Sequence, residues 1–108
     1  EHSWDLCKSF DGASPCGAIR AAAEIGHPAN GAIWLEVGGE QRQKGDLGDL
    51  IWDMPEIIVR LSALSRLEPG DLIWSGTMGS TRAMEPGDTY EIEISGVGTL
   101  SNKVVQGK

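Results

Sequence analysis

The pair Gly76-Thr77 has the residue types needed to hold an anion at the end of a strand. It follows a short apolar run at residues 72–74, which a turn at 68–71 precedes. An apolar run bounded by turn signals predicts a buried strand. A glycine directly after such a strand lets the backbone approach a ligand closely, and the threonine hydroxyl can then donate to an anion.

Lys8 is the second candidate for contact with an anion. It stands beside Ser9, in a stretch of small residues that contains Pro15 and continues to Gly17. Proline and glycine at this density predict a loop rather than a helix. A lone lysine in a loop is more often solvated surface than part of a site, so the residues alone leave both interpretations open.

Two acidic groupings could suggest a metal site, but each has a simpler interpretation. Asp46, Asp49 and Asp53 do not have the ligand spacing of a calcium-binding loop. Asp53 stands directly before a helical pattern and is predicted to cap it. Glu91 and Glu93 alternate with isoleucines, which places them on the solvent side of a predicted strand. The residues therefore predict no metal site in this chain.

The cysteines favour free thiols over a disulfide, which would close a small loop, and they do not indicate a zinc site. Cys7 and Cys16 are the only two, and in an acidic chain with no recognisable export signal they are expected to be free thiols. The sequence contains neither a C-x-x-C pair nor the cysteine and histidine spacing of a zinc site.

The elements that position the candidate residues are mostly strands. Ala32–Val37 alternates in polarity, and Gly38-Gly39 predicts a tight turn into a polar returning strand at residues 40–44. Thr89–Ile94 alternates in the same way, and a glycine-rich turn then sends the chain back over residues 99–105. These patterns predict hairpins with one apolar face.

One amphipathic helix is predicted over Met54–Leu64. Asp53-Met54-Pro55-Glu56 has the pattern of an N-cap with a capping box and a proline in the first turn. Apolar residues recur at helical spacing and predict that one side of the helix packs on the core. They are Met54, Ile57, Ile58, Leu61 and Leu64.

The remaining stretches are predicted to be irregular or extended. Residues 1–6 and 79–84 are predicted loops. Residues 18–25 contain alanines that favour helix, but glycines enclose the stretch, so strand or extended chain is preferred. The sequence Glu-Pro-Gly-Asp occurs at 68–71 and again at 85–88 and predicts a type II turn at both places.

Length and charge restrict the fold and the class of partner. At 108 residues the chain is expected to form a single domain, 1–108, mainly β in an α+β arrangement. A net charge of −7 argues against binding to nucleic acid or to anionic membranes. Without an apolar run long enough to span a bilayer, and without a signal-peptide pattern, a cytoplasmic location is expected.

Taken in order, these motifs resemble the C-terminal half of the catalytic domain of the fumarylacetoacetate hydrolase (FAH) family. The resemblance covers nearly the whole chain, and the stretch from Gly26-His27-Pro28 to Glu36 is most similar to the fumarylpyruvate hydrolase branch. It is carried by Lys8-Ser9-Phe10-Asp11 with Pro15, Ile33-Trp34-Leu35-Glu36-Val37 with Gly39-Glu40 and Arg42-Gln43, residues 49–51, the helix, residues 67–73, Gly76-Thr77, Pro86-Gly87-Asp88 and residues 96–100.

The resemblance implies a fold, a reaction and roles for the candidate residues. The fold would be part of a mixed β-roll or sandwich with one packed amphipathic helix. The reaction would be C–C bond hydrolysis of an acylpyruvate such as fumarylpyruvate, with Mg²⁺ or Mn²⁺ held by acidic residues. Lys8 would contact the substrate oxo group or the enolate that develops from it. Gly76 and Thr77 would bind the substrate carboxylate.

Departures from the family pattern restrict what this chain is expected to do alone. The family's metal-binding carboxylates and its acid–base pair belong to positions before the equivalent of Lys8. The chain alone is therefore expected to hold no metal and to be inactive. Cys7 stands where glycine is usual, and Met78 follows Thr77 where the family often has proline.

Two hypotheses follow from the resemblance. In one, the chain is part of an oxo-acid hydrolase whose metal site comes from a complementary chain carrying the N-terminal half. In the alternative, it is a non-catalytic half-domain that acts as a binding or oligomerisation module. Both predict association through exposed apolar edges, as a homo-oligomer or with the complementary chain. A small oxo acid is the expected ligand.

Overall fold

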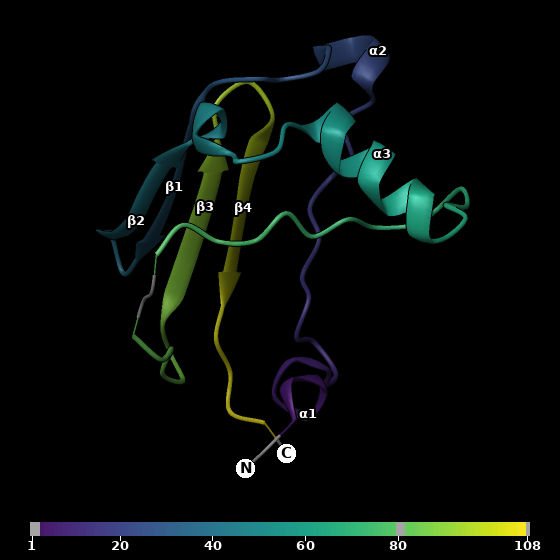
Figure 1. Ribbon diagram of the computed structural model, residues 1–108. Helices are drawn as coiled ribbons and strands as arrows, with labels where there is room; N and C mark the ends of the chain where they lie inside the picture. The colour runs from purple at the N-terminus through teal and green to yellow at the C-terminus, as the bar shows by residue number, and fades with distance from the viewer. Residues whose placement is uncertain (1–2, 80–81, 108) are drawn as a thin grey trace.

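A four-stranded antiparallel sheet is the centre of the computed structural model (Figure 1), which describes residues 3–79 and 82–107. Its strands lie in the order β2-β1-β3-β4. They are β1 (Ala32–Val37), β2 (Glu40–Asp46), β3 (Thr89–Ile94) and β4 (Gly98–Lys103). The fold is thus mainly β, as the alternating patterns predicted.

Two hairpins build the sheet where the sequence predicted them. Gly38 and Gly39 join β1 to β2 with φ of 60° and 81°, values that suit glycine because it has no Cβ. In the second hairpin the Val97 N–H donates to the Ile94 carbonyl at 3.0 Å. Relative to the prediction, β2 continues to Asp46, and β4 starts one residue earlier and ends at Lys103.

One face of the sheet carries the apolar side chains. Leu35 lies opposite Ile92, and Ile92 lies opposite Leu100, so the central residues of three strands share this face. Leu35 and Val37 are the buried hydrophobic residues of the described chain, each 7% exposed. We call this side of the sheet the inner face.

The main helix, α3 (Met54–Leu64), has the bounds that its pattern predicts. Asp53 caps it, because its carboxylate accepts a hydrogen bond from the Glu56 N–H at 2.9 Å. The reciprocal half of the predicted capping box is not made. The Glu56 carboxylate instead accepts hydrogen bonds from Arg60, at 2.8 and 3.2 Å.

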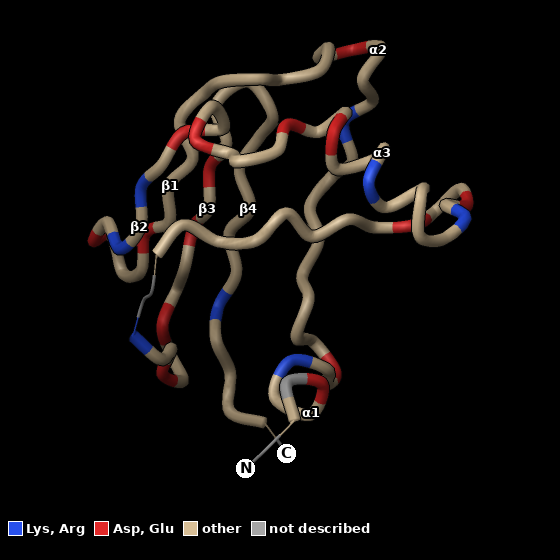
Figure 2. Tube along the Cα trace, in the orientation of Figure 1, with Lys and Arg blue, Asp and Glu red and all other residues tan. Residues whose placement is uncertain are grey.

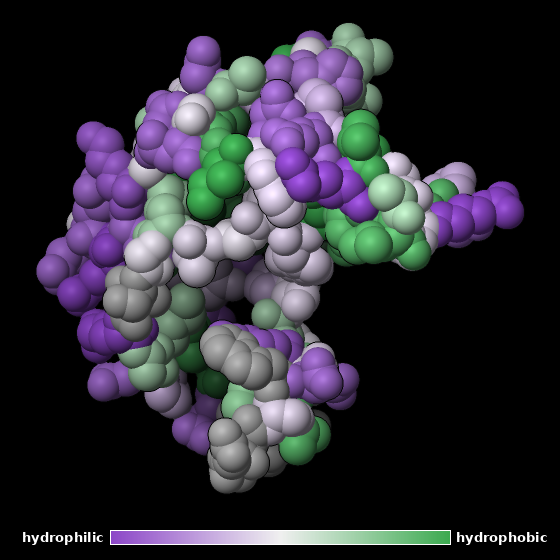
Figure 3. All heavy atoms as spheres, in the orientation of Figure 1, coloured by the Kyte–Doolittle hydropathy of each residue, from purple (hydrophilic) through white to green (hydrophobic). Residues whose placement is uncertain are grey.

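The apolar stripe of α3 is less covered than predicted. No residue of this helix is buried, and Ile58 and Leu64 are 48% and 86% exposed. Figure 3 shows apolar atoms open to solvent around α3. The helix therefore lies beside the sheet with its stripe only partly packed, because little of the described chain covers its far side.

The short helices correct two predictions. Residues 1–6 were predicted irregular, but α1 (Trp4–Lys8) forms, with Ser3 as its N-cap. The stretch 18–25 was predicted extended, yet it ends in one helical turn, α2 (Ala22–Ile25), where alanine propensity prevails. A 3₁₀ turn, η1 (Leu47–Asp49), follows β2. None of the helices in the described ranges has the length and apolarity needed to cross a membrane.

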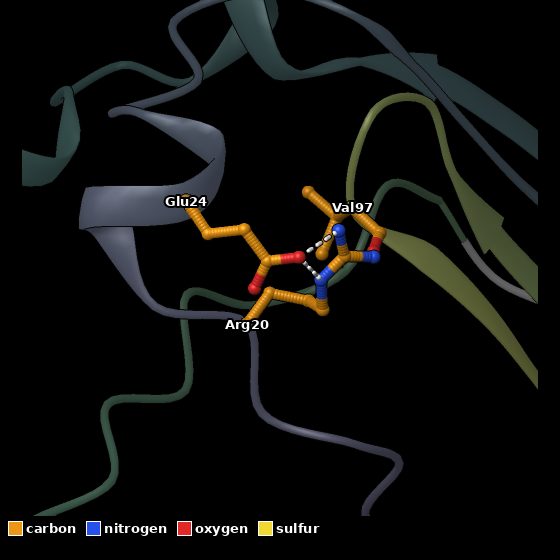
Figure 4. Close-up of polar contacts among 3 residues, drawn as sticks. All are labelled: Arg20, Glu24 and Val97. Atoms are coloured by element: carbon orange, nitrogen blue, oxygen red, sulfur yellow. Dashed lines mark hydrogen bonds and ion pairs between the residues drawn. The ribbon is translucent and has the colours of Figure 1, made fainter.

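The segment between the N-terminal loop and β1 is tied to the sheet by Arg20 (Figure 4). Its guanidinium donates to the Glu24 carboxylate at 2.6 and 3.1 Å and to the Val97 carbonyl at 3.2 Å. This contact joins α2 to the β3–β4 turn.

The predicted strand at residues 72–74 is not formed. Leu72, Ile73 and Trp74 are 64%, 40% and 71% exposed, and the segment belongs to no strand. In Figure 1 it runs from the end of α3 across the front of the sheet towards β2. The run is apolar, as its sequence shows, but no described strand pairs with it to accept its backbone hydrogen bonds. The loop predicted at 79–84 includes Ser80 and Thr81, which lie outside the described residues.

Candidate functional site

A hollow of about 470 Å³ lies where the segment carrying Gly76 and Thr77 crosses the sheet. Its wall is built from β1, the end of β2, η1, the start of α3 and the crossing segment itself. The lining residues are Ile33, Asp46, Leu47, Asp49, Leu50, Ile51, Trp52, Ile57, Ser75, Gly76, Thr77 and Met78. Most of these residues are apolar, so the hollow is lined mainly by hydrocarbon side chains, with polar groups on part of its wall.

Thr77 is held at this hollow by Gln43 of β2. The Gln43 side-chain amide donates to Thr77 Oγ1 at 3.3 Å and to the Gly79 carbonyl at 2.7 Å. Because the Thr77 oxygen accepts this bond, its own hydroxyl hydrogen stays available to donate to a ligand. No charged residue stands on the crossing segment after Asp71 until Arg82 (Figure 2).

Two glycines make this placement possible. Gly76 has φ of 101°, in the region that favours glycine, so it turns the backbone directly before Thr77. A side chain at Gly45 would collide with the Met78 sulfur atom. The bare backbone of β2 at Gly45 therefore gives Met78 room to pack, on the same strand whose Gln43 holds Thr77.

The acidic residues of the hollow accept hydrogen bonds from backbone amides. Asp46 Oδ1 accepts hydrogen bonds from the N–H groups of Gly31 and Gly48 at 3.2 and 2.8 Å. Asp49 Oδ2 accepts from the Asp46 N–H at 3.2 Å, which completes a capping box around η1. These carboxylates shape the loop from β2 to α3, and both residues are exposed.

An aromatic wall closes the hollow on the α3 side. Trp52 is 45% exposed, and the guanidinium carbon of Arg60 lies 4.0 Å from the centre of its ring. Arg60 also pairs with Glu56 at 2.8 Å, so its charge is balanced within the helix. This arrangement fixes Trp52 against the first turns of α3.

Lys8 does not line the hollow that contains Thr77. It lines a second, open hollow at the N-terminal loop with residues 9–14. The two hollows share no lining residue. The described chain therefore places the two candidate contacts from the sequence, Lys8 and the Gly76-Thr77 pair, in different hollows.

No metal-binding cluster is found among residues 3–79 and 82–107. No group of three or more histidine, cysteine, aspartate or glutamate side chains there could hold a metal ion. Glu91 is exposed and Glu93 is half-buried on the outer side of β3. Cys7 and Cys16 are free and exposed, as expected for unpaired thiols.

Gln43 is the contact that the sequence did not single out. It was placed on a polar, exposed returning strand, yet it lies half-buried on the inner face, opposite Leu35. Residues directly opposite one another in an antiparallel pair share a face. The usable signal was thus the register of the hairpin, which follows from the two-residue turn at Gly38 and Gly39.

Comparison with known proteins gives a consistent result. The family model described as fumarylacetoacetate (FAA) hydrolase C-terminal matches residues 1–105. Among curated proteins, the oxaloacetate tautomerase FAHD1, mitochondrial, of Rattus norvegicus is 37% identical over 105 residues, which cover 97% of this chain and 48% of the relative. The chain thus spans about half the length of that relative.

Solved structures agree in fold. The fumarylpyruvate hydrolase of Pseudomonas aeruginosa, in complex with Mn²⁺ and pyruvate, superposes with a TM-score of 0.92 at 40% identity, over 97% of this chain and 45% of that one. The maleylpyruvate hydrolase of Sphingobium sp. SYK-6, in complex with manganese (II) ion and pyruvate, gives a TM-score of 0.78 at 37% identity, over 83% and 34%.

Replacing Gln43 by alanine is expected to loosen the crossing segment. The substitution removes both hydrogen bonds to residues 77 and 79, and no other described hydrogen bond holds their backbone. Backbone NMR order parameters at Gly76–Gly79 should fall from about 0.85 towards 0.6 or below. Gln41→Ala is the matched control, since Gln41 is exposed on the same strand. Unchanged order parameters in the Gln43 variant would show that the segment is held by other contacts.

Proposed function

The chain belongs to the fumarylacetoacetate hydrolase family, and from that premise we propose that it supplies the oxo-acid-binding part of a site for an acylpyruvate. The reaction proposed for the complete site is the hydrolysis of a C–C bond, of the type for which the fumarylpyruvate and maleylpyruvate hydrolases are named. Water and an acylpyruvate then give pyruvate and a carboxylic acid.

The observation that carries the proposal is the Gly76-Thr77 corner at the hollow. The Thr77 oxygen accepts a hydrogen bond from Gln43, and its hydroxyl hydrogen stays available to donate to an anion. The positive φ of Gly76 turns the backbone directly before Thr77, and without a Cβ the glycine lets a ligand approach the main chain there. A carboxylate is the group that such a pair of donors binds best. Two of the solved relatives are complexes with pyruvate, which carries this carboxylate beside an oxo group.

Lys8 has the chemistry for the second role. An ammonium group near the substrate oxo oxygen stabilises the negative charge that grows there as the enolate forms. In this chain Lys8 ends α1 and lines a separate, open hollow, so the role requires that this end of α1 meet the oxo acid in the complete site. We keep Lys8 as the proposed catalytic residue on its chemistry and on the family resemblance.

The family's divalent metal does not fit the described residues by themselves. Mg²⁺ and Mn²⁺ prefer several carboxylate oxygens in one place, and no such cluster lies within the described ranges. The acids at the hollow, Asp46 and Asp49, already accept hydrogen bonds from backbone amides. A catalytic form of this protein would therefore take its metal ligands from polypeptide outside these residues.

The same observation supports a second candidate function. A chain whose described residues form no cluster of metal ligands can still bind a small oxo acid or another polypeptide. We keep as the alternative a non-catalytic half-domain that acts as a binding or oligomerisation module. The two candidates differ in turnover and not in fold.

Thr77→Val is expected to weaken the binding of pyruvate to the chain by about tenfold or more. The substitution keeps the shape of the side chain and removes a hydroxyl donor to a charged group, whose loss costs about 1.5–3 kcal/mol. An NMR titration that follows the amide signals of Gly76 and of residue 77 measures the affinity. Thr99→Val, on exposed β4, is the control and should bind like the unaltered chain. Equal affinity in the Thr77 variant would place the carboxylate elsewhere.

Turnover separates the two candidate functions. The chain is incubated with acetylpyruvate and Mn²⁺, and the loss of the substrate absorbance is followed. No cleavage is expected from the chain alone, since residues 3–79 and 82–107 contain no cluster of metal ligands. Cleavage that Lys8→Ala abolishes would overturn the non-catalytic alternative. Electron paramagnetic resonance of added Mn²⁺ provides a control, because tight stoichiometric binding would reveal a metal site that the described residues do not show.

The exposed area of the chain supports association with further polypeptide. A folded monomer of 11.5 kDa is expected to expose about 5,800 Å². This chain exposes 8767 Å². The excess, about 3,000 Å², is larger than one partner's share of most obligate interfaces, which is about 1,000–2,500 Å². The exposed surface includes large apolar side chains, among them Ile51 at 94% and Leu64 at 86% exposure.

Self-association is therefore expected at high protein concentration, because it would cover this apolar area. Multi-angle light scattering should give a mass above 11.5 kDa. Leu64→Lys should reduce the mass, whereas Ala63→Lys, next to it on α3, introduces the same charge as a control. A monomer at every concentration would contradict the prediction.

A further inference from the structure

From the lining of the hollow beyond Thr77, we infer that the site binds an oxo acid whose far end, opposite the carboxylate at Thr77, is uncharged and apolar. We infer further that Trp52 contacts this end and selects for it. The inference rests on the proposed function, since it assumes that the carboxylate lies at Gly76 and Thr77. It adds a substrate class that the family membership leaves open.

The first step is the charge of the lining. Among the described residues that line the hollow, there are two acids, Asp46 and Asp49, and no lysine, arginine or histidine. Arg60, whose guanidinium carbon lies 4.0 Å from the centre of the Trp52 ring, pairs with Glu56 at 2.8 Å. A second carboxylate on the ligand would therefore meet acidic groups without a free positive partner.

The second step is the apolar wall. Leu47, Leu50 and Trp52 line the hollow together on the η1 and α3 side. Burying apolar surface there stabilises a hydrocarbon tail by about 0.8 kcal/mol for each methylene that is fully covered, which corresponds to about fourfold in affinity. A tail that is covered only in part would still gain about tenfold over pyruvate.

The third step is the position of Trp52. The residue is 45% exposed and lines the hollow, while Arg60 stacks on its ring from α3. A flat aromatic surface held in this way suits an acyl or alkyl tail and favours it over a hydrated carboxylate. This preference would set the chain apart from a hydrolase of fumarylpyruvate, whose acyl group ends in a second carboxylate.

The test compares two ligands that differ only at the far end. The probes are 2-oxoheptanoate, which ends in a methyl group, and 2-oxoheptanedioate, which ends in a carboxylate, with pyruvate as the reference. Affinities for the full chain are measured by NMR titration. We expect 2-oxoheptanoate to bind about tenfold more tightly than 2-oxoheptanedioate. Trp52→Ala should reduce the difference to the part that the acidic lining and the leucines give, whereas Trp52→Phe, which keeps an aromatic ring, should preserve most of it.

Trp74→Ala is the matched control, since Trp74 is 71% exposed and does not line the hollow. It should retain the full preference. Equal binding of the two ligands, tighter binding of the dicarboxylate, or a preference that Trp52→Ala leaves undiminished would overturn the inference, while pyruvate binding leaves the proposed function intact. If pyruvate and both longer acids fail to bind, the proposed function itself fails.

Discussion

Two hydrogen bonds from one side chain decide where the candidate site lies. The crossing segment pairs with no strand, so its backbone has no ladder to fix its position. Gln43 fixes it instead, through Thr77 and the Gly79 carbonyl. The hollow, the orientation of the Thr77 hydroxyl and the packing of Met78 over Gly45 all depend on this attachment to β2.

This dependence on polar contacts follows from a small interior. Leu35 and Val37 are the buried hydrophobic residues of the described chain, so packing alone orders little beyond the centre of the sheet. Local hydrogen bonds order the rest: Asp53 begins α3, Asp46 and Asp49 shape η1, and Arg20 ties α2 to the β3–β4 turn. Each works at short range and needs no complete core.

Features set by neighbouring residues could be predicted from the sequence, and features set by distant contacts could not. The alternation of apolar and polar residues, together with the glycine turns, predicted both hairpins. Apolar residues at helical spacing, together with a capping aspartate, predicted the bounds of α3. The apolar run at 72–74 has the same local signature as a buried strand, but whether it becomes one depends on a neighbouring strand that the run cannot specify. Gln43 was missed for a related reason, because its role comes from the hairpin register and from a segment far along the chain.

The order of the strands has a consequence for how the molecule assembles. β1 pairs with β2 and β3 pairs with β4 across short turns, so each hairpin can close early and locally. The contact of β1 with β3 joins the two hairpins and closes one long loop that contains η1, α3 and the crossing segment. High contact order slows this step. The hollow therefore comes into existence late, and a chain stalled after hairpin formation would show strand signals before it could bind any ligand there.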